Sequence, residues 1–173
     1  MLRLWSMPRT GGTIRFMRKK PDTRIDSVGR TLRVVGDYWT FLVLREAFFR
    51  VRRFDAMHKN LGISRNILAD RLKRLVRYGI LRKRRYQDGP PRYEYRLTEK
   101  GLDLYGVSVA MMVWGDKWLN RGAGPPLRLI HKRCGQPINP LLVCSNCGLE
   151  IVAREMDFEP SPGARGLRRA AEG

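Results

Sequence analysis

The stretch that most constrains the fold of this chain runs from Ile63 to Leu97 and reads ISRNILADRLKRLVRYGILRKRRYQDGPPRYEYRL. Between Ser64 and Tyr86 it holds nine Lys or Arg residues and a single acid, Asp70. In its first half, leucines recur at three- and four-residue spacing, as one face of a helix requires. Its second half is β-compatible and is interrupted by a Pro-Pro turn. The pattern therefore predicts one basic helix followed by a basic hairpin.

A helix-turn-helix is predicted around Gly62. A short helix begins near residues 52–55, and Gly62 ends it because glycine suits the left-handed conformation of a helix C-terminus. Ser64 is the expected N-cap of the next helix, over 64–78, since its hydroxyl can accept from free first-turn amides. The predicted inward stripe of that helix is Leu68, Leu72, Leu75 and Val76. In such a motif the outer face of the second helix lies in the major groove of DNA.

Candidate DNA-binding side chains lie on the outer face of this helix and on the hairpin after it. Asn66 can pair with adenine and Arg65 with guanine, each through two hydrogen bonds. Residues 88–91 are predicted to turn, which makes a wing over 86–92 that reaches backbone phosphates or the minor groove. The full predicted set is Ser64, Arg65, Asn66, Lys73, Arg74, Arg77, Arg84, Arg85, Gln87 and Arg92.

A long apolar helix is predicted to begin after Thr98, its expected N-cap. Its apolar face is made of Leu102, Tyr105, Val109, Met112 and Val113, and it ends near Trp114 and Trp118. A small winged helix cannot bury so wide a face, so we expect a homodimer interface that lets two modules grip a two-fold DNA site. The alternative is a monomer in which this helix packs back on Trp39 and Phe41, the expected core anchors.

The cysteines of the chain fall into one pattern, H-x2-C-x9-C-x2-C, made of His131, Cys134, Cys144 and Cys147. A glycine after each pair allows the backbone to turn toward a metal. Three thiolates and one imidazole form a closed tetrahedral Zn²⁺ site, which predicts a structural and not a catalytic role. The alternative is three inert thiols. The other histidine, His58, is expected to be an exposed helix residue.

The charge of the chain suits a polyanionic partner. Lys and Arg number 35 against 16 acids, a formal net charge of +19, and each phosphate neutralised by such a protein releases counterions. A merely soluble basic protein is the plainer alternative. No apolar run reaches the roughly 20 residues of a membrane span. The N-terminus lacks the apolar region of a secretory signal, so none is expected; its Arg-rich, acid-free composition fits a transit peptide or an unstructured leader. No catalytic motif is found, so no enzyme activity is expected. The odd cysteine count indicates a reducing, cytoplasmic setting.

The predicted fold class is α+β, mostly α: a winged helix-turn-helix with a long C-terminal dimerisation helix and a small zinc-ribbon-like appendage. The predicted domains are a flexible basic arm at 1–23, the DNA-binding domain at 24–122, the zinc-binding extension at 123–153 and a disordered tail at 154–173. Either Met1 or Met17 can serve as the start.

Four segments carry a family resemblance: GDYWTFLVLRE, RRFDAMHKNLGISRNILADRLKRL, PPRYEYRLTEKG and MMVWGDKWL. They resemble the HxlR-type winged helix-turn-helix transcriptional regulators, which are related to the MarR group. The resemblance covers about 24–122 and implies homodimers through the first and long helices, a recognition helix at 64–78 and a wing at 86–92. Several members sense oxidants through a cysteine before the first helix, but residues 24–28 hold no thiol here. The His-Cys-Cys-Cys tail resembles an extension on some members.

We therefore expect a dimeric regulator that binds double-stranded DNA by sequence in the cytoplasm, associated with the nucleoid. The alternative is a zinc protein that binds RNA or DNA without sequence preference, which the spread of charge into both tails suggests. A small-molecule effector can fit between the long helix and the winged core, but no residue names it.

Overall fold

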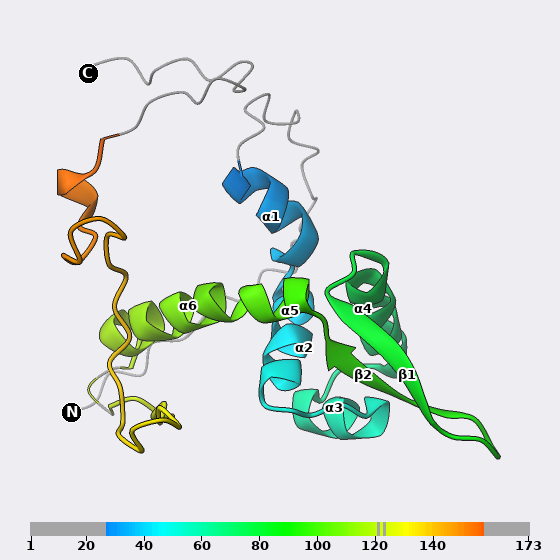
Figure 1. The fold of residues 1–173 in the computed structure, drawn as a ribbon. Coiled ribbons are helices and arrows are strands. Elements are labelled where there is room, and N and C mark those ends of the chain that lie inside the picture. Colours follow the sequence, from blue (N-terminus) through cyan, green and yellow to red (C-terminus); the bar gives the residue numbers. More distant parts are fainter. Residues whose placement is uncertain (1–26, 121, 123, 158–173) are drawn as a thin grey trace, which may run out of the picture.

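The computed structural model describes residues 27–120, 122 and 124–157. The predicted arm at 1–23 lies outside the described residues, as does the predicted tail beyond residue 157. The elements in chain order are α1 (Ser27–Val35), α2 (Tyr38–Phe48), α3 (Phe54–Leu61), α4 (Arg65–Arg77), β1 (Leu81–Gln87), β2 (Arg92–Leu97), α5 (Glu99–Asp103), α6 (Tyr105–Trp118) and the short 3₁₀ turn η1 (Ala153–Glu155). Helices dominate, with one small antiparallel sheet beside α4 (Figure 1).

The predicted helix boundaries around the turn are confirmed. Gly62 ends α3 in the left-handed conformation, with φ at 63°. Ser64 caps α4, and its Oγ accepts from the main-chain N of Ile67 at 3.3 Å. Thr98 caps α5 in the same way, through a 3.2 Å bond from Gly101 N. Since each cap depends on residues close in sequence, these boundaries could be found from local signals alone.

The predicted hairpin is also confirmed, with its turn at 88–91. Its register pairs Leu81 with Leu97, so Tyr93 and Tyr95 share one face, as expected. An unpredicted third strand-like segment joins it: Tyr95 N donates to Arg52 O at 2.8 Å, and Arg53 forms a bridge with Glu94. The segment between α2 and α3 therefore fixes the hairpin against the helices.

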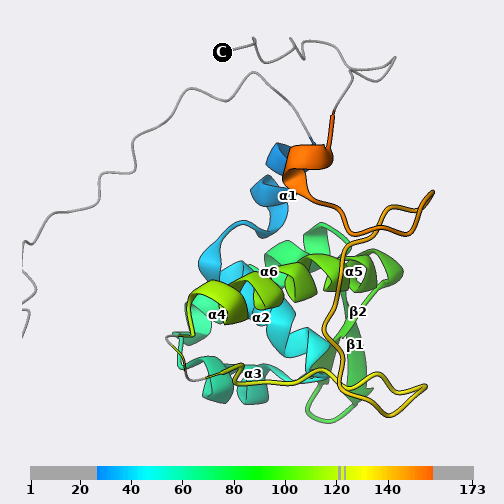
Figure 2. The ribbon, with the colours of Figure 1, turned by 90° about the vertical axis from the view of Figure 1, so that its left-hand side faces the viewer.

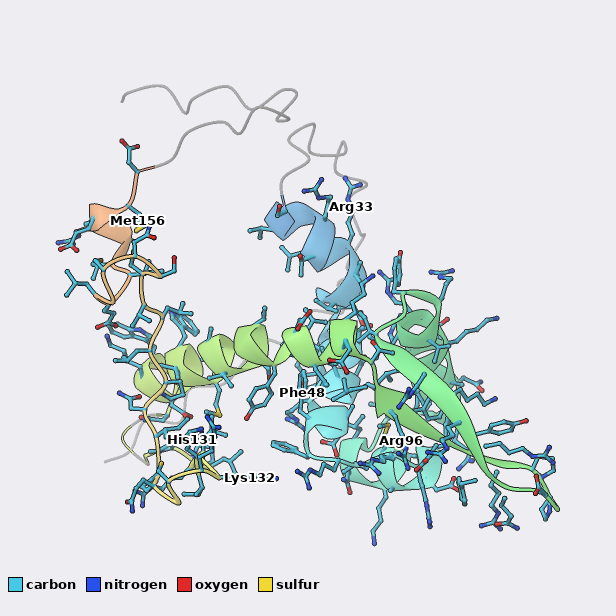
Figure 3. All side chains as sticks on the ribbon, in the orientation of Figure 1. Arg33, Phe48, Arg96, His131, Lys132 and Met156 are labelled. Carbon is cyan, nitrogen blue, oxygen red and sulfur yellow. The ribbon has the colours of Figure 1, made fainter. Side chains whose placement is uncertain are left out.

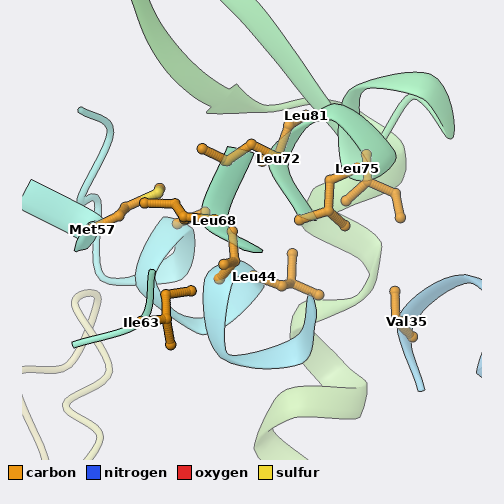
Figure 4. Packing of buried hydrophobic residues seen from close by; sticks show 11 residues of the cluster. Val35, Leu44, Met57, Ile63, Leu68, Leu72, Leu75 and Leu81 are labelled. Atoms are coloured by element: carbon orange, nitrogen blue, oxygen red, sulfur yellow. The ribbon is translucent and has the colours of Figure 1, made fainter. Parts of the chain in front are cut away.

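The core lies between α2, α4 and the start of β1. The predicted leucine stripe is confirmed, since Leu68, Leu72 and Leu75 are at most 1% exposed, and they pack against Leu44 (Figure 4). Burial of one such side chain contributes about 1.5–3 kcal/mol. The remaining fully buried members are Val43, Met57, Ile80 and Leu81. The inner face of α4 is thus anchored, which leaves its outer face free to project from the domain.

Two expectations need correction. The long helix predicted after Thr98 is split by a turn at Leu104, whose side chain packs against the core. Trp39 and Phe41 are half-buried and lie at the edge of the core, because Val43 and Leu44 fill its centre.

The helix after the split, α6, has no buried residue. Figure 1 shows it extending away from the winged helix, and in Figure 2, viewed from that side, it lies in front of α2 and α4. Among the described residues, no helix is both long and apolar enough to cross a membrane.

Candidate nucleic-acid interface

The helix α4 presents a polar, basic face on the side opposite its buried leucines. Arg65, Asn66 and Lys73 are exposed on that face, and so is Arg77. Ser64 is exposed as well, although its hydroxyl is engaged as the cap. Arg65 lies at the first turn, where its guanidinium pairs with Asp55 at 2.9 Å. Since both partners are solvent-exposed, this ion pair is weak and can be exchanged for a DNA contact.

Two arginines of α4 hold the helix in place. Arg71 Nε lies 2.9 Å from Asp37 Oδ1, at the N-terminus of α2. The Arg74 guanidinium donates to the main-chain oxygens of Val34, at 3.1 Å, and of Arg33. Both oxygens belong to the last turn of α1, where a cation is favoured by the helix dipole. The predicted DNA-binding residue Arg74 is therefore engaged inside the protein, unlike its neighbour Lys73.

Asp37 links these helices electrostatically. Its carboxylate caps α2 by accepting from Thr40 N at 3.0 Å. Partial burial is the largest single influence and raises the pKa of Asp37, but it is outweighed by the hydrogen bonds of Thr40 and the guanidiniums of Arg71 and Arg74. Together these lower the pKa of Asp37 below its usual 3.8. The ionised carboxylate is thus favoured in the folded protein.

The wing carries the second group of predicted residues. Arg85 is used in shaping its tip, because its guanidinium donates to Asp88 O at 2.8 Å and pairs with the Asp88 carboxylate at 3.1 Å. Gln87 also folds onto the tip, donating to Gly89 O at 3.2 Å. Arg84 and Arg92 are exposed and extend from the two strands. Figure 1 places this hairpin next to α4, with its tip projecting beyond the helices.

Sequence reasoning missed basic residues near this surface. Lys83 is exposed on β1, with its ammonium 3.9 Å from the centre of the Tyr93 ring, and Arg53 lies 4.7 Å from the centre of the Tyr86 ring. Lys83 could have been found from the charge run alone, since it lies between two arginines. Arg53 could not, because its place beside the wing depends on the bridge to Glu94.

A cavity of about 810 Å³ opens between the end of α2, the base of the hairpin and the start of α6. Its basic lining is Arg50, Arg52, Arg82, Arg96 and Lys132, and its aromatic lining is Phe48, Phe49, Tyr95 and Tyr105. Burial raises the pKa of Tyr95. Within the described part of the chain no acid lines this cavity, and among its cations only Arg96 has an ion pair, with Glu94 at 2.7 Å. Figure 3 shows Phe48, Arg96 and Lys132 around it.

The predicted metal ligands form two separate pairs. Cys134 Sγ lies 3.5 Å from His131 Nδ1 in the first turn of the C-terminal segment. In the second turn, main-chain amides of Cys147 and Asn146 donate to the Cys144 sulfur and lower the pKa of that thiol. Among the residues described, no group of three or more His, Cys, Asp or Glu lies close enough together to hold a metal ion. The two pairs therefore do not meet in this structure.

Comparison with known proteins identifies the family. The HxlR-like helix-turn-helix family matches residues 34–123. The uncharacterised HTH-type transcriptional regulator Rv3095 of Mycobacterium tuberculosis is 51% identical over 138 residues, which cover 80% of this chain and 87% of the relative. A regulator of the same type from Mycobacterium bovis, Mb3122, matches equally well.

Comparison with solved structures supports the same family. PA1607, a candidate transcription factor, has a TM-score of 0.73 and 34% identity, covering 80% of this chain and 97% of its own. PA1374 of Pseudomonas aeruginosa has a TM-score of 0.57 and 30% identity, covering 79% and 93%. The family and these relatives are regulators of transcription and not enzymes. The chain belongs to the HxlR-like helix-turn-helix family of transcriptional regulators.

Proposed function

We propose that this regulator binds double-stranded DNA by sequence, as a homodimer on a two-fold operator. The observation that carries the proposal is the two-sided structure of α4. Its leucines are fully buried, whereas Asn66 and Lys73 on the other face are exposed beside a basic wing. A helix held rigidly by its inner face can present the same side chains to base edges at every binding event.

The roles of the exposed residues follow from their chemistry. Asn66 and Arg65, in the first turn of α4, read base edges, because that end of a recognition helix enters the major groove. Lys73 and Arg77 neutralise phosphates and fix the register of the helix. On the wing, Arg84 and Arg92 extend to the backbone or the minor groove, while Arg85 and Gln87 hold the shape of the tip. Arg74 holds α1 against α4, and so it contributes to DNA binding only indirectly.

The homodimer is proposed from the surface of α6. Met111, Trp114 and Trp118 are 54%, 57% and 64% exposed along this helix. Val28 and Leu32 of α1 are similarly exposed. So large an apolar surface is unusual for a monomer, and a second copy of the chain would cover it. A two-fold dimer also supplies two recognition helices for the two halves of an operator.

A selection experiment tests this function. Binding duplexes are enriched from a random library by the full chain at a fixed salt concentration and then sequenced. The proposal expects a motif with two inverted half-sites about one helical turn of DNA apart. Asn66→Ala should lose the preference at one position in each half-site, whereas Lys73→Ala should keep every preference. Enrichment of no motif would favour the alternative, a zinc protein that binds RNA or DNA without sequence preference.

We also propose that the cavity beside α6 takes the effector, a small organic anion with a flat apolar body. Among the described residues, only Arg96 of its cations has an acidic partner, and aromatic rings together with Ala47, Leu97 and Leu102 line the rest of its wall. An aromatic carboxylate such as 2-naphthoate should bind the free protein more tightly than its neutral amide. Arg82→Ala should weaken 2-naphthoate binding about tenfold, the loss of one charge-assisted contact. Equal binding of acid and amide would contradict the proposal.

The cellular setting remains the one expected from the sequence: we propose that the dimer acts on DNA of the nucleoid, in the cytoplasm.

A further inference from the structure

The two Cys and His turns of the C-terminal segment are copies of one structural unit, repeated after thirteen residues. His131 corresponds to Cys144, Cys134 to Cys147 and Gly135 to Gly148. The flanking apolar residues repeat as well: Leu129 and Leu142, Ile130 and Val143, Ile138 and Ile151. A repeat that conserves ligands, glycines and apolar flanks at the same spacing indicates two halves of one site.

The main-chain hydrogen bonds of the two turns repeat at the same thirteen-residue spacing as the sequence. Each turn is closed by three main-chain hydrogen bonds at equivalent positions. In the first turn they run from Gly135 N to His131 O (2.8 Å), from His131 N to Gln136 O (2.9 Å) and from Ile138 N to Leu129 O (2.9 Å). In the second they run from Gly148 N to Cys144 O (2.9 Å), from Cys144 N to Leu149 O (2.8 Å) and from Ile151 N to Leu142 O (2.8 Å). Gly135 and Gly148 have φ values of 70° and 74°, which other residues rarely adopt.

The distance within the first turn fits two ligands of one zinc ion. With Zn–S of about 2.3 Å and Zn–N of about 2.0–2.1 Å at a tetrahedral angle, a thiolate and an imidazole nitrogen lie about 3.5–3.6 Å apart. Cys134 Sγ and His131 Nδ1 are separated by 3.5 Å. In the second turn, the main-chain N of Asn146 donates to Cys144 Sγ at 3.4 Å. The first turn therefore holds half of a tetrahedral donor set in advance, and the second turn has the same main-chain geometry.

We propose that the two turns close on a single Zn²⁺ ion, held by His131 Nδ1 and the thiolates of Cys134, Cys144 and Cys147 of the same chain. Figures 1 and 2 show the turns as separate loops, so binding requires that they move together. The nine residues that join Cys134 to Cys144 are long enough for this, since an extended residue spans about 3.3–3.6 Å. Binding releases the three thiol protons and leaves no open coordination position, so the ion is structural.

The apolar residues of the segment give a second reason for closure. Ile130 beside the first turn is 55% exposed, and Leu142 and Leu149 beside the second are 63% and 70% exposed. A segment this short cannot build an adequate core alone and is commonly stabilised by a metal. Closure of the turns would bring these side chains together. The segment therefore folds as a compact unit with zinc, beside a winged helix that has its own core.

The test uses the full chain and Co²⁺ as a spectroscopic probe for Zn²⁺. Elemental analysis of carefully dialysed protein should give one zinc per chain. Co²⁺ should produce the intense visible absorption of a tetrahedral thiolate site. Cys134→Ser and Cys144→Ser should each weaken Co²⁺ binding by more than about a hundredfold, since even an outer-shell partner is worth 10–100-fold. His58→Ala, which removes the other histidine, is the matched control and should keep one ion.

Two results would overturn the proposal. The first is the absence of stoichiometric zinc together with weak Co²⁺ binding that neither serine variant changes. The second concerns the same-chain assignment. If a mixture of the Cys134→Ser and Cys144→Ser proteins regains tight Co²⁺ binding, the site is made between two chains, because each variant still supplies one intact turn.

Discussion

Lys73 and Arg74 are adjacent cationic residues of α4, and the structure predicts opposite effects of replacing each of them by alanine. Lys73 is exposed on the proposed DNA face. Arg74 donates to main-chain oxygens of Val34 and Arg33. Each alanine variant removes one positive charge, so each controls for the loss of net charge in the other. Any difference between them must come from where the side chain is placed.

The two variants should change different quantities: Lys73→Ala the salt dependence of DNA binding, and Arg74→Ala the stability of the fold. Lys73→Ala should reduce the salt slope of DNA binding by about 0.9, so its deficit relative to wild type shrinks about 3.5-fold between 50 and 200 mM salt. Its stability should be unchanged within about 0.5 kcal/mol. Arg74→Ala should lose about 1–3 kcal/mol of stability, because two charge-assisted hydrogen bonds to α1 disappear. Its salt slope should equal that of wild type.

Fluorescence anisotropy with one labelled duplex gives the slope, and urea unfolding followed by circular dichroism gives the stability. If Arg74→Ala lowers the slope by about one and leaves the unfolding midpoint unchanged, then Arg74 contacts phosphate and its assignment to α1 is wrong. If Lys73→Ala leaves the slope unchanged, the proposed orientation of α4 on DNA fails.

Three further predictions concern packing, protonation and assembly. Gly101→Ala should lower the free energy of unfolding by about 1–3 kcal/mol, because its new Cβ would press on the Ile80 carbonyl. Gly106→Ala, with open space around its Cβ, is the control, and equal urea midpoints for the two variants would contradict this packing. Asp37→Asn should be less stable than wild type near neutral pH, because the ionised carboxylate with its lowered pKa stabilises the folded protein. This deficit should begin to shrink near pH 3.8 and should be lost as pH falls through the lower pKa that Asp37 has in the folded protein; a deficit constant from pH 7 to about pH 2 would refute the role of that charge. Trp114→Glu should yield monomers in light scattering and weaken operator binding, whereas unchanged dimers would remove α6 from the interface.

The sequence was sufficient where the structural signal is local. Gly62, Ser64 and the leucine stripe define α3 and α4 within a few residues of one another, so the helix-turn-helix and its outward face could be predicted. The hairpin turn at 88–91 could be predicted for the same reason, since its Gly and Pro residues are adjacent in the sequence. These features predicted the element on which most of the candidate DNA-binding residues lie, and the exposed side of α4.

The rest depends on contacts between distant segments. The bridge between Arg53 and Glu94 and the bonds from Arg74 to α1 join residues about forty apart, and no periodicity reports them. Glu46 is a similar case: it is 3% exposed and accepts from Asn60 at 2.8 Å, so a carboxylate lies in the core where a pattern of apolar residues would not place it. The turn at Leu104 could not be predicted, because the apolar pattern continues through it. Leu104 packs against the core, and that contact depends on tertiary structure.

The most direct measurement of the central claim is the affinity ratio between the selected operator and other nucleic acids. Binding of the full chain to that duplex, to a shuffled duplex of equal length and to a matched RNA is measured at one salt concentration. Sequence-specific recognition by α4 predicts that the operator binds at least about 10³-fold more tightly than the other two. If all three bind within about tenfold of one another, the chain does not read sequence and the proposed function is contradicted.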